Sequence, residues 1–156
     1  MIDQPVMIIT GTRKGIGKNL AEYYTQNGFI VIGCSRGNID FELNNYEHYC
    51  LDVSDESLVK KMFKDIRKKY GRLDVLINNA GVASENHVLL TPLKEAHDSL
   101  NTNFIGTFIF CRESVKLMKI KQHGRIINIS SIHVPIALAG TSIYGASKAA
   151  IEQFSR

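Results

Sequence analysis

The sequence predicts an α/β domain with a doubly wound parallel sheet and helices on both faces. Short apolar runs alternate with longer amphipathic stretches, and a glycine-rich turn joins the first run to the first such stretch. Strands separated by helices pair in parallel through right-handed crossovers. The apolar runs are continuous, which is typical of strands buried on both faces of a sheet. With no internal repeat or linker, residues 1–156 are expected to form one domain.

The order of elements follows from these patterns. The apolar runs predict five strands, over residues 6–10, 29–34, 48–51, 73–78 and 125–129. The amphipathic stretches predict four helices, over residues 15–27, 55–70, 92–119 and from 142 onward. The third helix is expected to bend near Gly106.

Capping residues mark the expected helix ends. Gly28 and Gly71 follow the first two helices, where glycine accepts the left-handed conformation of a C-cap. Ser54 is expected to cap the second helix at its N-terminus. Thr91 and Pro92 are expected to be the N-cap and the first residue of the third.

Composition narrows the class of protein. The 156 residues are 44% hydrophobic and 22% charged, as in ordinary globular domains. No apolar run approaches eighteen residues, so no membrane span is expected. The N-terminus lacks the pattern of a secretory signal, and we expect a cytoplasmic protein.

Charge and cysteine usage argue against two kinds of site. The net charge is +4, and the basic residues of the second helix are interrupted by Glu56 and Asp65, which favours a solvated face over nucleic-acid binding. Cys34, Cys50 and Cys111 lack metal-ligand spacing, so we expect no metal site and interpret them as small buried hydrophobic residues in a reducing cytoplasm.

The glycine-rich turn is the first candidate site. It reads Thr10-Gly11-Thr12-Arg13-Lys14-Gly15-Ile16-Gly17 and lies between an expected strand and an expected helix. Glycines let the backbone approach a pyrophosphate, and the helix that follows directs free N–H groups at the anion. This context favours dinucleotide binding over a structural turn.

The end of the second strand indicates which dinucleotide binds. An NAD site places an acid there to hold the ribose 2′-hydroxyl. This chain has Ser35 and Arg36 instead, with no acid before Asp40. A guanidinium pairs with a 2′-phosphate, and Lys14 is placed to help, so NADP(H) is expected over NAD(H). The alternative is that Arg36 is a solvated loop residue.

A tyrosine and a lysine form the second candidate site. Tyr144 and Lys148 lie four residues apart at the start of the last expected helix, on one face. A free phenol does not ionise at neutral pH, and a nearby ammonium stabilises the phenolate. Ser131, 13 residues before Tyr144, follows the carboxyl end of the fifth strand, where ligands bind in parallel sheets. Ser130 would point to the opposite face.

Three more segments follow strands or begin a helix. Asn78-Asn79-Ala80-Gly81 follows the fourth strand, Asp52-Val53 the third, and Asn103 lies within the third expected helix. Together with the glycine-rich turn and the Ser-Tyr-Lys set, these motifs resemble those of the short-chain dehydrogenase/reductase family. The likeness extends to its 3-oxoacyl-[acyl-carrier-protein] reductase branch, and it covers essentially the whole chain.

The resemblance implies a Rossmann-type fold and hydride transfer between NADP(H) and a carbonyl or alcohol substrate. It implies a catalytic tetrad of Asn103, Ser131, Tyr144 and Lys148. Tyr144 would exchange a proton with the reacting oxygen, Ser131 would polarise the carbonyl, Lys148 would hold the nicotinamide ribose, and the Asn103 backbone would hold a water. The implied cofactor-binding residues are Gly11, Thr12, Arg13, Lys14, Gly15, Ile16, Gly17, Ser35, Arg36, Asp52, Val53, Asn79, Ala80, Gly81, Tyr144 and Lys148.

Two features depart from the family. His133 stands near the position of a usual glycine, where an acid–base role or a local hydrogen bond in the loop are the alternatives. Family members also continue through further strands and a substrate-covering segment, so we expect part of a longer enzyme, a homodimer or homotetramer at full length. A naturally short form and a non-catalytic dinucleotide-binding module are the alternatives. The fifth strand would form an exposed, aggregation-prone edge.

Overall fold

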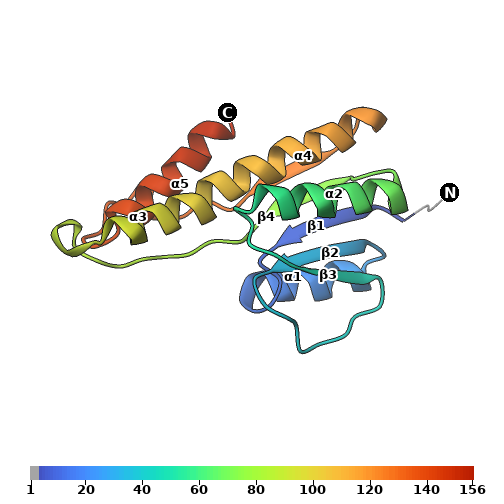
Figure 1. Cartoon of the computed structure of the whole chain (residues 1–156), viewed down its shortest axis with the longest axis horizontal. Coiled ribbons are helices and arrows are strands. Elements are labelled where there is room, and N and C mark those ends of the chain that lie inside the picture. The colour runs from blue at the N-terminus through green and yellow to red at the C-terminus, as the bar shows by residue number, and fades with distance from the viewer. Residues whose placement is uncertain (1–3) are drawn as a thin grey trace.

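A computed structural model describes residues 4–156 as one parallel sheet between helices (Figure 1). The strands lie in the order β3-β2-β1-β4-β5, and all neighbours are parallel. They are β1 (Val6–Thr10), β2 (Ile30–Ser35), β3 (Tyr46–Cys50), β4 (Val75–Asn78) and β5 (Arg125–Asn128). The sequence-based fold class is confirmed, and the chain order reverses between β1 and β4, where such sheets bind ligands.

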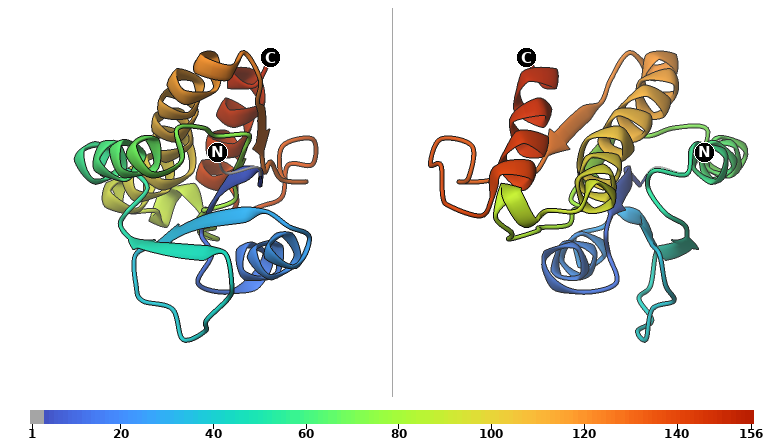
Figure 2. Two further views of the ribbon diagram at one scale, coloured as in Figure 1. Left: turned by 90° about the vertical axis from the view of Figure 1, so that its right-hand side faces the viewer. Right: turned by 60° about the vertical axis from the view of Figure 1, so that its left-hand side comes forward.

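Helices cover both faces of this sheet. They are α1 (Gly15–Gln26), α2 (Glu56–Tyr70), α3 (Leu93–Leu100), α4 (Gly106–Lys121) and α5 (Ser142–Phe154), with short helical segments η1 (Val88–Leu90) and η2 (Asn101–Ile105). In Figure 2, α1 lies on one side of the sheet, and α2 and α4 lie on the other. None of the helices within residues 4–156 combines the length and the apolar character needed to cross a membrane.

The core has two layers because successive strand residues point to opposite faces. Val6 and Ile8 of β1 pack with α2 and α4, in a cluster that includes Phe63 and Phe110. Met7 and Ile9 pack on the other face with Ala21 of α1. All five residues of β1 are buried, which explains why a continuous apolar run predicts this strand.

Two predicted caps are wrong. The N-cap of α2 is Asp55, whose carboxylate accepts the N–H groups of Ser57 and Leu58, whereas Ser54 bonds to Asp52. An ionised carboxylate at this position also interacts favourably with the helix dipole.

The predicted start of α3 is also displaced. Its N-cap is Pro92, and the Thr91 hydroxyl donates backward to the His87 carbonyl rather than to the helix. The Thr91 hydroxyl is used by the short turn of η1, so it does not serve α3.

The predicted bend near Gly106 is a π-helical segment. The segment η2 lies between α3 and α4, and Gly106 begins α4. A Cβ at Gly106 would come within 2.6 Å of the Val53 side chain, so glycine permits this close approach of helix and loop. The predicted third strand is shifted: β3 begins at Tyr46, and its residues are partly exposed rather than forming a buried apolar run.

Candidate active site

A groove of about 430 Å³ opens where β1, β2 and β4 end. Its lining includes most of the predicted cofactor residues: Gly11, Arg13, Lys14, Ile16, Ser35, Arg36, Asp52, Val53, Asn79, Ala80 and Gly81. Sequence reasoning missed five further lining residues: Cys34, Gly37, Leu51, Val82 and Thr102. Each of the five is the immediate sequence neighbour of a predicted site residue, so the groove extends one residue beyond the motifs.

The glycine-rich turn is built for close backbone approach. Gly11 has a φ of +76°, and a Cβ there would lie 2.9 Å from the Ala80 Cα. A Cβ at Gly17 would lie 2.2 Å from the Gly11 carbonyl oxygen. Both positions therefore require glycine, and side chains there would obstruct the turn. Thr12, Gly15 and Gly17 shape the turn without lining the groove.

The N-terminus of α1 faces this turn without a side-chain cap. Lys14 occupies the N-cap position and makes no capping hydrogen bond. The first N–H groups of a helix have no partner within the helix, and the dipole makes that end positive. This end of the groove therefore suits an anion such as a pyrophosphate.

Three cations surround the edge of the same groove. Arg13, Lys14 and Arg36 are exposed and line it together. The Arg13 Nη1 lies 3.2 Å from the place that a Cβ on Gly37 would occupy, so this guanidinium lies over the turn that follows β2. Ser35, beside which the sequence predicts the adenosine ribose, lines the groove together with these cations.

Asn79 and Ala80 join the end of β4 to the end of β1. The backbone N–H groups of both residues donate to the Thr10 hydroxyl, at 3.0 and 2.9 Å. The Asn79 side chain donates to the Thr10 carbonyl at 2.8 Å. These bonds therefore hold Asn79 and Ala80, which line the groove, against the end of β1.

Asn103 lies at the other end of the groove and is fully buried in η2. Its side chain accepts the Val82 N–H at 2.8 Å and donates to the Val82 carbonyl at 2.9 Å. It also donates to the Ser147 hydroxyl of α5 at 2.8 Å. The side chain thus ties the loop after β4 to α5, while its backbone carbonyl accepts the Thr107 hydroxyl at 2.7 Å.

Lys148 is buried next to Asn103. Its Nζ donates to the Ile129 carbonyl at 2.7 Å, and burial lowers the pKa of this ammonium group. A Cβ on Gly81 would lie 3.6 Å from Lys148 Nζ and 3.3 Å from Asn103 Oδ1. Because Gly81 lines the groove, these two predicted catalytic residues lie at its end.

His133 contacts both the predicted serine, Ser131, and the predicted tyrosine, Tyr144. The rings of His133 and Tyr144 pack edge to face with centroids 5.5 Å apart. The His133 N–H donates to the Ser131 hydroxyl at 3.2 Å, so His133 makes a local hydrogen bond through its backbone. Its Nδ1 is buried with no hydrogen-bond partner within residues 4–156. Ser130 donates to the Glu152 carboxylate of α5 at 2.5 Å.

Comparison with known proteins places these features in context. A family model described as "short chain dehydrogenase" matches residues 5–156. The chain is 34% identical over 150 residues to a 3-ketodihydrosphingosine reductase of Bacteroides thetaiotaomicron, covering 96% of this chain and 55% of that protein. It is 30% identical over 157 residues to the 3-oxoacyl-[acyl-carrier-protein] reductase FabG of Escherichia coli, covering 97% and 64%.

Solved structures are similar over the same region. The structure of ElxO with NADP bound has a TM-score of 0.90 and 34% identity, covering 97% of this chain and 65% of that one. A 4-hydroxyisoleucine dehydrogenase complexed with NADH has a TM-score of 0.87 and 26% identity, covering 97% and 66%. The chain therefore spans about half to two thirds of the length of the proteins it matches.

Proposed function

Because the chain belongs to the short-chain dehydrogenase family, a family of oxidoreductases, we propose that it transfers hydride between NADP(H) and a carbonyl or alcohol group. The observation that carries the proposal is the composition of one groove. Its rim holds three cations, and its far end reaches Gly81, beside Lys148 and Asn103. A phosphorylated dinucleotide would place its charged and reactive ends at these two places.

The residues present fit a dinucleotide. Gly11 and Gly17 leave space that a Cβ would fill, and the uncapped end of α1 offers N–H groups to the pyrophosphate. Asp52 and Val53 line the groove where an adenine ring would lie. Arg13, Lys14 and Arg36 would pair with a 2′-phosphate, which an acid in this place would repel.

The remaining residues would handle the substrate oxygen and its proton. When bound, the nicotinamide supplies or accepts the hydride. Tyr144 would donate its phenolic proton to the oxygen of the substrate during reduction and accept it back during oxidation. Ser131 would hydrogen-bond the same oxygen and polarise the carbonyl. Lys148 would hold the nicotinamide ribose and stabilise the Tyr144 phenolate.

Asn103 has two parts in this proposal. Its backbone would hold a water, as the sequence motif implies. Its buried side chain bonds Val82 and Ser147. We therefore also assign the side chain the role of positioning α5, and with it Tyr144 and Lys148, relative to the groove.

The substrate class is a ketone or secondary alcohol. Candidates include 3-oxoacyl thioesters, sugar derivatives, steroids and other small ketones. The names of two relatives, a 3-ketodihydrosphingosine reductase and a 3-oxoacyl-[acyl-carrier-protein] reductase, favour the reductive direction on a keto group.

Replacing Tyr144 by phenylalanine tests the proposal. The variant keeps the ring, and with it the packing on His133, but loses the proton. We expect kcat to fall by about 100-fold or more, the usual contribution of general acid–base catalysis, while NADPH still binds. The assay is reduction of an activated ketone alongside NADPH fluorescence titration.

The two serines provide the matched control. Ser131→Ala should lower kcat much more than Ser130→Ala, since the Ser130 hydroxyl is occupied by Glu152. Turnover of Tyr144→Phe within a few-fold of the parent would remove Tyr144 from the mechanism. Tight NADPH binding without turnover in the unmodified protein would favour the non-catalytic binding module instead.

A further inference from the structure

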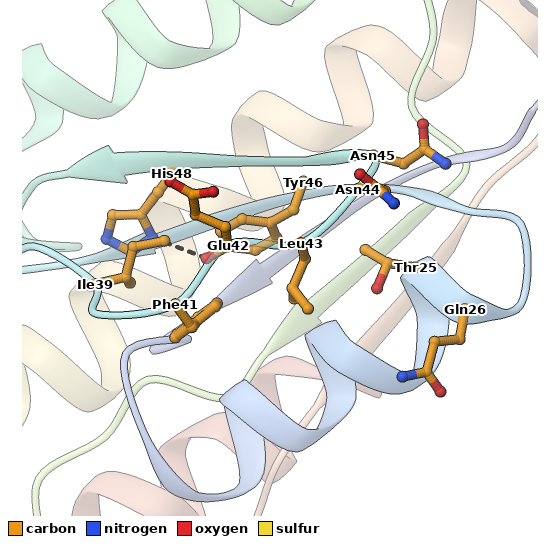
Figure 3. Close-up of a pocket in the computed structure, with 10 residues that line it drawn as sticks. All are labelled: Thr25, Gln26, Ile39, Phe41, Glu42, Leu43, Asn44, Asn45, Tyr46 and His48. Atoms are coloured by element: carbon orange, nitrogen blue, oxygen red, sulfur yellow. Dashed lines mark hydrogen bonds between the residues drawn. The ribbon is translucent and has the colours of Figure 1, made fainter.

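A chain of hydrogen bonds runs behind the cofactor groove, along the α1 side of β2 and β3. The Thr12 hydroxyl and the Tyr46 hydroxyl are 2.7 Å apart, and Tyr46 Oη lies 2.8 Å from His48 Nδ1. His48 Nε2 lies 3.0 Å from the Ser35 hydroxyl and 3.2 Å from the Gly37 carbonyl oxygen. Figure 3 shows Tyr46 and His48 joined by one of these bonds at a cavity of about 910 Å³. The chain thus connects the phosphate-binding turn to the turn after β2.

The direction of each bond follows from the Gly37 carbonyl, which can only accept. His48 Nε2 therefore carries the proton, and in the neutral ring Nδ1 is the acceptor. The Tyr46 hydroxyl then donates to Nδ1 and accepts from Thr12. Burial lowers the pKa of His48, which favours this neutral form at pH 7. Each donor in the chain then has an acceptor.

The turn after β2 is held from two sides. The Gly37 carbonyl accepts the Ser35 hydroxyl at 2.7 Å as well as His48 Nε2. On the groove side, Arg13 lies over Gly37, and Arg36 lies between the two residues that His48 contacts. The position of His48 therefore fixes the backbone that carries Arg36.

Gly33 makes room for this chain in the centre of β2. A Cβ at Gly33 would come within 2.0 Å of Tyr46 Oη and 2.4 Å of Thr12 Oγ1. The neighbouring β2 residues on either side, Ile32 and Cys34, are fully buried apolar residues. A glycine in this strand interior is otherwise unfavourable, so the hydrogen bond between Thr12 and Tyr46 accounts for its presence.

We propose that His48 is a positioning residue for cofactor selection. It holds the Ser35–Gly37 turn so that Arg36 meets the adenosine 2′-phosphate, and through Tyr46 it ties this turn to Thr12 of the phosphate-binding turn. This inference rests on the proposed binding of NADP(H). The affinity for NADH depends less on His48, since NADH has no group for Arg36 to pair with.

His48→Leu tests the proposal by the ratio of the NADH and NADPH dissociation constants, measured by fluorescence titration in the full chain. We expect the NADPH preference to fall about tenfold, equal to about 1.4 kcal/mol, with NADH affinity changed much less. His48→Gln keeps a donor for Gly37 and should restore most of the preference. Leu43 lines the same cavity but takes no part in the chain of hydrogen bonds, so Leu43→Ala should leave the ratio of the two dissociation constants unchanged.

A second variant covers the case in which His48→Leu fails to fold. Tyr46→Phe keeps the ring contact with Phe41 and removes only the hydroxyl. It should lower the NADPH preference by a smaller factor than His48→Leu. An unchanged ratio in both His48→Leu and Tyr46→Phe, or equal weakening of both cofactors, would overturn the inference. If the unmodified protein shows no NADPH preference, the proposed function fails instead.

Discussion

The groove has a cofactor end, next to β1 and β2, and a proposed catalytic end, on the side of β5. The strand β1 is buried along its whole length, and β2 is buried along its first five residues. By contrast, no residue of β5 is fully buried. On the face of the sheet that α1 covers, two paired residues of neighbouring strands show this difference in burial. Ile77 of β4 packs in the core, but its register partner Ile127 of β5 is 44% exposed. The cofactor end is therefore fixed by core packing.

The proposed catalytic end combines aromatic packing with polar contacts. The Phe154 ring of α5 packs edge to face on Phe104 and Phe108. Lys148 bonds to the Ile129 carbonyl, and the loops on either side of the site meet where the Asn86 N–H donates to the Gly140 carbonyl. The Asn103 side chain adds the link to α5. Under the proposed function, cofactor binding and chemistry therefore depend on different contacts, and variants at one end should leave the function of the other end intact.

Lys148 is the residue whose replacement should affect both cofactor binding and chemistry most strongly. Lys148→Ala removes both the charge proposed to act on Tyr144 and a proposed ribose contact. We expect kcat to fall by about 100-fold or more, together with a clear loss of NADPH affinity. Lys148→Met, which keeps most of the buried chain length, should behave alike. Steady-state kinetics and NADPH titration would measure both, and unchanged affinity would restrict Lys148 to the chemical step.

Arg36→Asp should change cofactor preference at the cofactor end without changing the chemistry at the other end. A carboxylate there repels the 2′-phosphate and can accept a ribose 2′-hydroxyl. Charged hydrogen bonds of this kind contribute about 1.5–3 kcal/mol, so the NADPH preference should fall roughly 10- to 100-fold. Turnover at saturating NADH should stay near that of the parent. A variant that binds both cofactors normally would mean that Arg36 is a solvated loop residue.

The smallest expected effect is a loss of stability in the core of the cofactor end. Gly33→Ala forces a methyl group against Tyr46 and Thr12, and overpacking of this kind costs about 1–3 kcal/mol of unfolding free energy. Gly37→Ala is the control, since its methyl would meet only the end of the flexible Arg13 side chain. Urea denaturation would compare the two, and equal stabilities would contradict the packing described around Gly33.

The sequence predicted the order of the five strands and placed β1, β2 and β5 within one residue of their observed bounds. The third strand was displaced because Tyr46, Glu47 and His48 do not form an apolar run. Hydrophobicity marks a partly exposed strand of this kind only weakly. The strand at the other edge of the sheet, β5, contains Ile126 and Ile127, and this apolar run predicts it.

In the candidate site, local spacing was predictable from the sequence and long-range contacts were not. Local spacing placed Tyr144 and Lys148 on α5 and the glycines in the turn. The side-chain partners of Asn103 could not be predicted, because Val82 and Ser147 are 21 and 44 residues away. The contact of Thr12 with Tyr46 likewise joins residues that are 34 positions apart in the sequence. Gly33, which makes room for this contact within β2, is the sequence feature that could have indicated it.

The most direct test of the account is the affinity of the unmodified protein for the two cofactors. Fluorescence titration with NADPH and with NADH, under one buffer and salt concentration, gives the two dissociation constants. The three cations at the groove predict that NADPH binds at least about tenfold more tightly, the effect of one charged hydrogen bond. Tighter binding of NADH would contradict the assignment of this end of the groove to the 2′-phosphate.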